Sequence, residues 1–167
     1  MELEVTLSPS SIADARKSVE GYIAELNSHL ESAIDAICEV GTAAAKASVP
    51  VDTGRLSWSI QAEKAGNLSR EVTAQAVDGN GHSYAAFVEF GTGVIGAAAG
   101  YPGDLSGWEY NQVRTPEAHE GDGWWYIHPG DGEAHFTLGR AGAHYMADAA
   151  AAMRQRTHDE VRRSFDG

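Results

Sequence analysis

The spacing of apolar side chains predicts a long amphipathic helix near the start of the chain. Between residues 12 and 40, apolar positions recur at intervals of three and four, which is the period of a helix with one buried face. Ser8 and Pro9 suit the N-cap and the first helical position, with Ser11 as a second possible N-cap. Pro50 disfavours helical backbone at the residue before it, so we expect the helix to end just ahead of this proline.

The length of this helix is itself informative. It would measure ~55 Å, which is more than a domain of 167 residues covers by itself. We therefore expect either a kink at Gly21 or Gly41, or a neighbouring subunit that covers part of the apolar stripe.

Alternating apolar and polar positions predict extended strands elsewhere. Residues 2–7 alternate in this way and are expected to form a strand. Residues 56–63 and 72–76 also alternate, and the Gly-Asn turn between them predicts a β-hairpin. A second hairpin is expected to pair 124–127 with 134–136 across a Pro-Gly-Asp-Gly turn, with its aromatic face in the core.

The remaining segments complete the predicted fold. Residues 84–90 are apolar and fit either a strand or one or two helical turns, and the Gly-, Pro- and acid-rich residues 91–123 are expected to form a long loop with Trp and Tyr embedded in it. A last helix is expected to begin near Ala143. We predict one α+β domain over residues 1–167, with the long N-terminal helix and the C-terminal helix packed on a small antiparallel sheet.

Composition narrows the functions that the chain can have. The 24 acidic and 12 basic side chains give a net charge of −12, whereas tight binding of nucleic-acid phosphates needs many Lys and Arg. The single cysteine, Cys38, excludes a disulfide framework or a cysteine-rich zinc site and is expected to be a core residue. We also expect no secretory signal and no membrane-spanning segment.

One short motif resembles a protease signature. Asp52-Thr53-Gly54 matches the D-T-G of aspartic proteases, in which two aspartates share a proton. However, Pro50 interrupts the strand that should lead into the motif, and the cation of Arg55 opposes a shared proton. We favour a tight turn from helix into strand, and the protease remains an alternative.

Two other patterns lack the context that their chemistry needs. Residues 91–96 spell G-x-G-x-x-G without the surrounding βαβ unit of a dinucleotide site, so a glycine turn is favoured. The seven histidines form no H-x-x-x-H or H-E-x-x-H pair. His128 and His135 are expected on the solvent face of the second hairpin, paired with Glu133 and Tyr126 and not with each other. We therefore predict no catalytic residue, no cofactor and no metal site.

Two longer motifs together resemble a bacteriophage family. Residues 49–56 read V-P-V-D-T-G-R-L with Ser59-Ile60 after them, and resemble the signature P-x-D-T-G-x-L…S-I. Residues 84–93 read Y-A-A-F-V-E-F-G-T-G and resemble Y-A-x-x-V-E-F-G-T-G of the same family. This is the family of head–tail joining proteins (neck or tail-component proteins) of long-tailed bacteriophages, and the resemblance spans about residues 10–155.

The resemblance is close but not complete. Longer members carry a Trp- and Tyr-rich insertion before the last helix, similar to residues 107–110 and 123–126. The family enters that helix through A-R/Q-P-F-M/L, whereas residues 141–146 read A-G-A-H-Y-M and lack the proline. How the last helix starts is therefore left open by the sequence.

The resemblance implies a structural virion protein and not an enzyme. Such a subunit joins or completes the tail at the head–tail interface, in a homo-oligomeric ring through which DNA passes. The expected partners are copies of the chain itself and the neighbouring connector, stopper and tail proteins. The expected location is the virion neck, after assembly in the host bacterial cytoplasm. An acidic DNA-mimic inhibitor, with acids spread along an exposed face, is a third alternative.

Within the two motifs we expect architecture and not chemistry. The structural motif residues are Asp52, Thr53, Gly54, Arg55, Leu56, Tyr84, Val88, Glu89, Gly91, Thr92 and Gly93. Their three glycines are expected to adopt backbone angles that other residues avoid, and Arg55 and Glu89 have the charges to form an ion pair. The candidate partner contacts are Trp108, Tyr110, Trp124 and Tyr126. Trp124 and Tyr126 equally fit a role in covering the domain's own sheet.

Acidic residues are concentrated in one part of the chain. Residues 78–135 hold nine acids against one base, Arg114. The nine are Asp78, Glu89, Asp104, Glu109, Glu117, Glu120, Asp122, Asp131 and Glu133. If some of them line a lumen, their charge would keep passing DNA from adhering; a solvated acidic loop is the alternative.

Overall fold

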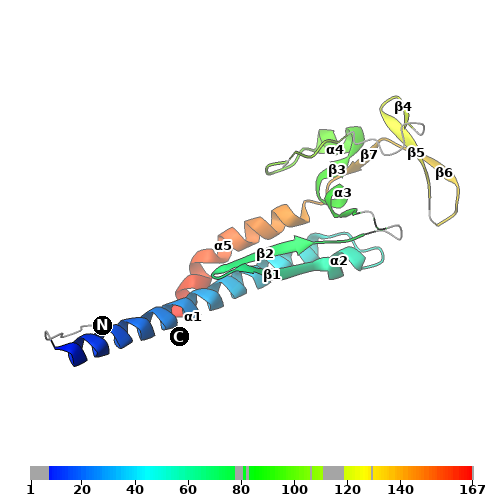
Figure 1. Ribbon diagram of the computed structural model, residues 1–167. Helices are drawn as coiled ribbons and strands as arrows, with labels where there is room; N and C mark the ends of the chain where they lie inside the picture. The colour runs from blue at the N-terminus through cyan, green and yellow to red at the C-terminus, as the bar shows by residue number, and fades with distance from the viewer. Residues whose placement is uncertain are drawn as a thin grey trace.

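The structure is a computed structural model with an α+β architecture, as the sequence predicts. It describes residues 8–77, 81, 83–105, 107–110, 119–128 and 130–166. Two helices lie side by side at the centre, a β-hairpin lies along the longer of them, and short helices and strands gather at one end (Figure 1). The predicted strand over residues 2–7 lies outside the described residues.

Helix α1 (Pro9–Ser48) runs for 40 residues, or about 60 Å. The Ser8 side chain caps it by accepting a hydrogen bond of 3.2 Å from the Ser11 backbone N–H, and Pro9 is its first residue, as expected. The helix continues through both Gly21 and Gly41 and runs straight in Figure 1, so the alternative of a kink at a glycine is wrong.

Helix α5 (Tyr145–Asp166) packs antiparallel along the C-terminal half of α1. Near the middle of α5, Met153 lies over Gly41, where an added Cβ would meet the methionine sulfur at 2.5 Å. Near its end, the Phe165 ring lies 5.2 Å from that of His29. Two helices approach this closely because one of them carries no side chain at the point of contact.

The first predicted hairpin is present but begins later than expected. Strands β1 (Ile60–Gly66) and β2 (Ser69–Ala74) pair antiparallel and lie along α1. Residues 56–59, predicted as strand, instead belong to helix α2 (Arg55–Ser59). Leu56 and Ile60 are four residues apart and both buried, so one helical turn satisfies the same apolar spacing as alternation.

Residues expected to open a long loop are partly regular. Helix α3 (Ala85–Phe90) leads into strand β3 (Gly91–Thr92), and helix α4 (Gly93–Ala99) follows directly. Strand β3 pairs antiparallel with β7 (Gly139–Ala141). The loop prediction is therefore wrong for residues 91–99, because β7 arrives from a distant part of the chain to pair there.

The second hairpin has the predicted register but not the predicted burial. Strands β4 (His119–Glu120), β5 (Gly123–Ile127) and β6 (Ala134–Thr137) form one antiparallel sheet. Trp125 pairs with Phe136 as expected. However, these two side chains are 45% and 44% exposed, so the aromatic face is not a core face.

The core lies where the end of α1, the start of α5, the β1–β2 hairpin and α3 meet. Its buried members are Ala45, Val49, Leu56, Ile60, Ala76, Ala85, Tyr145 and Ala149. The Tyr145 hydroxyl satisfies its polar atom by donating a 3.1 Å hydrogen bond to the Ala85 carbonyl oxygen. None of the helices in the described part of the chain has the length and apolarity to cross a membrane.

Cys38 provides a simple test of the helix packing. It is 3% exposed on α1, and burial, with a smaller contribution from the charge of Asp35, raises the pKa of its thiol. A raised pKa leaves less of the reactive thiolate at a given pH. We expect a thiol reagent at pH 8 to label the folded chain at least ~10-fold more slowly than the chain in urea. Equal rates would contradict the burial of this helix face.

Candidate functional site: the G-T-G segment and the start of the last helix

A buried carboxylate on α3 lies at the centre of this region. Glu89 is 3% exposed. Its Oε2 accepts a hydrogen bond of 2.8 Å from the Met146 N–H, and its Oε1 accepts one of 3.0 Å from the Ala147 N–H. The Tyr101 hydroxyl donates a third bond of 2.7 Å to Oε1. The buried carboxylate thus accepts three hydrogen bonds, all of them from donors within the protein.

This carboxylate acts as an N-terminal cap for α5. The first N–H groups of a helix lack partners within the helix and carry its positive end, so a buried negative charge there is stabilising. Backbone bonds hold the same two segments together: Ala143 N–H donates to Val88 O at 2.7 Å, and His144 N–H donates to Glu89 O at 3.1 Å. The last helix therefore starts at Tyr145 without the family's proline, because α3 holds its first turn.

Glu89 also affects the tyrosines around it. Burial, then the hydrogen bond and negative charge of Glu89, raise the pKa of Tyr101. Burial and the same charge raise the pKa of Tyr145. Both hydroxyls therefore remain protonated donors, which the bond from Tyr101 to Glu89 requires.

Two expectations for Glu89 need correction. As a buried cap it cannot be one of the acids that line a lumen. It also does not pair with Arg55, which is exposed at the first residue of α2, while the Glu89 oxygens are occupied by α5 and Tyr101. The pairing was suggested by opposite charge alone, and charge does not reveal which of two residues is buried.

The G-T-G glycines have the backbone role that the sequence predicts. Gly91 and Gly93 have φ of +84° and +61°, a region that other residues rarely occupy. Both also lie against the backbone of β7 and the residues before it, so that an added Cβ would collide with it. Gly93 N–H donates a 2.8 Å bond to Tyr110 O, which occupies the donor that a phosphate would need in a dinucleotide site.

The D-T-G segment connects α1 to helix α2, so the predicted turn from helix into strand is wrong about the element that follows it. Asp52 and Thr53 are exposed between α1 and α2. Gly54, with φ of +78°, is the N-cap residue of α2, and Leu56 is buried in the core. The segment therefore reverses the chain and anchors α2 through its leucine.

The four aromatic candidates for partner contacts differ in exposure. Trp108 is half-buried, with its ring 4.9 Å from that of Phe87 and 5.4 Å from that of Phe90. Tyr110 and Trp124 are also half-buried. Only Tyr126 of the four is exposed, at 40%, so three of them pack on the chain's own fold.

Two other apolar side chains are more exposed than these aromatic residues, and the sequence did not predict their exposure. Trp58 is 75% exposed and Val51 is 74% exposed, both near the D-T-G turn. Trp58 was assigned to a buried strand face, and only the helical turn of α2 directs it away from the core. The sequence signal for this helical turn is the four-residue spacing of Leu56 and Ile60, which fits a helix as well as a strand.

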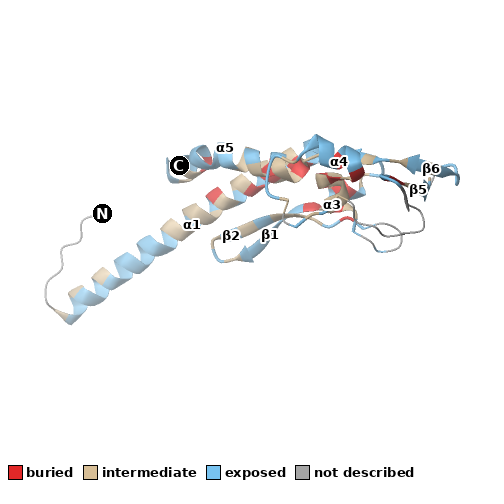
Figure 2. Cartoon of the chain, turned by 90° about the horizontal axis from the view of Figure 1, so that it is seen from above, coloured by how far each residue is buried: buried red, intermediate tan, exposed pale blue. Residues whose placement is uncertain are grey.

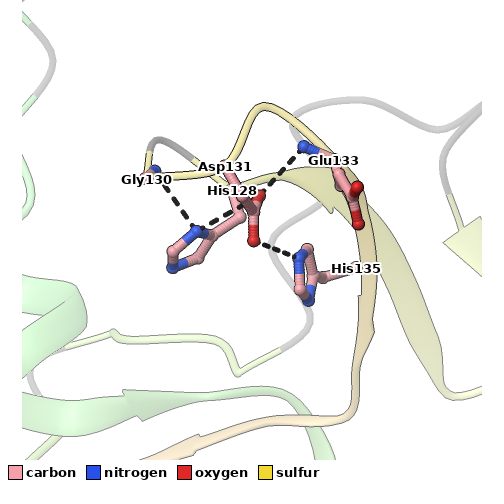
Figure 3. Close-up of polar contacts among 5 residues, drawn as sticks. All are labelled: His128, Gly130, Asp131, Glu133 and His135. Atoms are coloured by element: carbon pink, nitrogen blue, oxygen red, sulfur yellow. Dashed lines mark hydrogen bonds and ion pairs between the residues drawn. The ribbon is translucent and has the colours of Figure 1, made fainter.

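The predicted separation of two histidines is wrong. His135 does lie opposite Tyr126, and His128 bonds through its backbone to Glu133, as expected. However, the two imidazole rings also lie together, with centroids 5.1 Å apart (Figure 3). The search for helical histidine spacings did not predict this contact, because the turn between β5 and β6 brings the two rings together.

The structure describes only part of the acidic segment. Asp78, Glu117 and Arg114 lie outside the described residues, whereas Asp104, Glu109, Asp122 and Glu133 are exposed. The lumen prediction remains a prediction for these exposed acids.

Removal of the buried carboxylate should destabilise the fold. Glu89→Ala leaves two buried helix N–H groups and the Tyr101 hydroxyl without their acceptor, and we expect the free energy of unfolding to fall by ~3 kcal/mol. Tyr101→Phe removes one bond of the same network, and we expect a loss of ~1 kcal/mol. Urea unfolding measures both, and equal losses would contradict the capping role.

A pair of glycine substitutions separates backbone strain from close packing. Gly91→Ala introduces strain at positive φ and a Cβ 2.5 Å from Arg140 O, so we expect ~3 kcal/mol of destabilisation. Gly100 also has a positive φ, of +73°, but has nothing within 4 Å of an added Cβ. Gly100→Ala should therefore cost only ~1 kcal/mol. Equal losses in urea unfolding would show that the contact of β3 with β7 is not tight.

Comparisons with known proteins agree with the motif analysis. Residues 14–91 match the family model described as "Bacteriophage HK97-gp10, putative tail-component". The matched residues cover most of α1, the D-T-G turn, the β1–β2 hairpin and α3 up to the first glycine of G-T-G. No curated protein and no solved structure matches the chain. The resemblance indicated by the two motifs is thereby confirmed: over residues 14–91 the chain resembles the HK97-gp10-like family of bacteriophage tail components.

Proposed function

We propose that the chain is a structural subunit of a bacteriophage tail at the head–tail interface, where copies of it join or complete the tail as a ring around the path of the DNA. The family match supports a tail component. The observation that carries assembly into a ring is the N-terminal half of α1, which nothing in the described part of the chain covers.

The exposed half of α1 has an apolar stripe. All the buried residues of α1 lie at or after Ala33, and Figure 2 shows the preceding part of the helix extending beyond α5 and the hairpin. The stripe consists of Ile12, Val19, Tyr22 and Ile23, which are 52%, 42%, 51% and 49% exposed. A helix with such a stripe is normally packed against another surface, and a contiguous exposed apolar patch marks an interaction site.

A second exposed apolar surface lies at the other end of α1. It is formed by Val51 and Trp58, next to the D-T-G turn. Two different apolar surfaces, one near each end of α1, suit a head-to-tail contact. In such a contact, the stripe of one copy meets the surface beside the D-T-G turn of the next copy. Contacts of that kind generate rings when the rotation between copies closes.

The exposed acids suggest which part of the subunit faces the DNA. Asp104, Glu109, Asp122 and Glu133 are exposed and belong to a segment with a single base in the sequence. In a ring, we place this segment toward the DNA, where like charge would keep the nucleic acid from adhering during passage. The neighbouring partners would then be the connector and stopper proteins above and the tail proteins below.

The proposal is tested in a phage whose copy of this gene is disrupted. We expect electron microscopy to show filled heads beside detached tails, because the junction is incomplete. Tails of abnormal length would instead support the completing role at the tail's end. Intact, infectious particles would overturn the proposal.

Complementation of that phage with matched variants tests the stripe itself. Ile23→Glu places a charge in the stripe, and we expect it to reduce the yield of infectious particles at least ~100-fold, because a charge buried at an interface costs several kcal/mol. Ala24→Glu makes the same change in charge about 100° further around the helix, outside the stripe, so we expect normal yield. Both sites are exposed, and circular dichroism should show that both variants fold. Equal yields would remove the stripe from the interface.

A further inference from the structure

Three side chains with metal-ligating atoms converge at the tip of the β5–β6 hairpin. His128 directly follows β5, Asp131 lies in the turn, and His135 lies in β6. One nitrogen of each histidine and one oxygen of Asp131 all lie within 4.8 Å of one another. Figure 3 shows the Asp131 carboxylate directed between the two imidazole rings.

We propose that His128, Asp131 and His135 bind a divalent transition-metal ion, with Zn²⁺ as the best fit. Imidazole nitrogens and a carboxylate oxygen are a common ligand set for this ion. The site carries one negative charge and two nitrogen ligands, and this set favours Zn²⁺ over Mg²⁺, which prefers oxygen ligands.

The distances already approach those of a bound site. Asp131 Oδ1 lies 3.4 Å from His128 Nδ1, and Asp131 Oδ2 lies 3.0 Å from His135 Nε2. Tetrahedral zinc with bonds of about 2.0–2.1 Å separates its ligand atoms by about 3.4 Å. The two contacts use different oxygens of one carboxylate, so the side chains must still turn to bring three ligand atoms, now within 4.8 Å of one another, around one ion.

The hydrogen bonds at His128 support a cation in this position. The Gly130 N–H donates a 3.2 Å bond to His128 Nδ1, so this nitrogen presents a lone pair and not a proton. Asp131 Oδ1, 3.4 Å away, is also an acceptor. Two acceptors that face each other are unfavourable without a positive charge nearby. A metal ion would supply that charge, and on binding it would take the Nδ1 lone pair that otherwise accepts the Gly130 N–H bond.

The backbone of the turn holds the ligands in place. Asp131 Oδ1 accepts a 2.9 Å bond from the Glu133 N–H. His128 exchanges backbone bonds of 2.9 Å each with Glu133 and Gly132. Such supporting bonds orient metal ligands before the ion arrives.

The ion would act as a clip across the hairpin. It would join the end of β5 to β6 through the turn, in a small sheet whose Trp125 and Ile127 are 45% and 65% exposed. Small sheets with so little burial are weakly stable in water, and metal binding to the folded form adds stability. Three protein ligands leave a fourth position of a tetrahedral ion open.

Calorimetric titration of the full-length, tag-free chain tests the proposal. We expect one Zn²⁺ per chain at this site and no binding of Mg²⁺ in the same buffer. His135→Gln should weaken Zn²⁺ binding at least ~10-fold. His158→Gln is the control, because this histidine is 84% exposed on α5 and lies apart from the hairpin, and its affinity should equal that of the unaltered chain.

A second measurement identifies the ligands directly. In nitrogen-15 spectra of the imidazoles, Zn²⁺ should shift the signals of His128 and His135 and leave that of His158 in place. If the His128→Gln/His135→Gln double variant binds Zn²⁺ as tightly as the unaltered chain, the proposal is overturned. It is also overturned if protonation moves the two signals and Zn²⁺ does not, because the cluster would then be a hydrogen-bonded pair only. All of these substitutions are at partly exposed positions, so circular dichroism should show an intact fold.

Discussion

The bond between the Glu89 carboxylate and the first turn of α5 is the contact on which the rest of the fold depends. Helix α5 is the main partner of α1, and its position is set at its N-terminal end by a residue of α3. Next to this contact, Tyr145 is 1% exposed and links α5 to α3 through its hydroxyl. A single buried carboxylate thus joins α3 to α5, and the G-T-G segment that follows it pairs with β7 next to this contact.

Helix α1 has two environments along one continuous element. Its C-terminal half supplies Ala33, Cys38 and Ala45 to buried packing, while its N-terminal half has an apolar stripe and no partner among the described residues. Helical propensity alone supports such a projecting segment only weakly, and most helices in proteins are stabilised by packing. The structure therefore resembles one component of an assembly more than a self-sufficient domain, in agreement with the tail-component family of residues 14–91.

The sequence predicted those parts of the fold that depend on local patterns. The start of α1 followed from Ser8 and Pro9, and the hairpin pairings followed from alternation and turn residues. It was wrong for residues 56–59, where strand and helix periods coincide, and for 91–99, where a distant strand decides the structure. The role of Glu89 could not be predicted, because its partners lie 57 and 58 positions away. The histidine cluster was missed because its spacing fits a turn and not a helix.

The order of α1 and α5 along the chain has a consequence for synthesis in the cell. Helix α1 is complete at Ser48, but its partner α5 begins only at Tyr145, about a hundred residues later. At ~5–20 residues per second, the ribosome needs ~5–20 s to produce the second helix after the first. During this time both the stripe and the later core face of α1 are uncovered, in a nascent chain that cannot yet close its fold. Apolar surface exposed in this way promotes aggregation, and a chaperone or a helix of a neighbouring copy that covered it would oppose that aggregation.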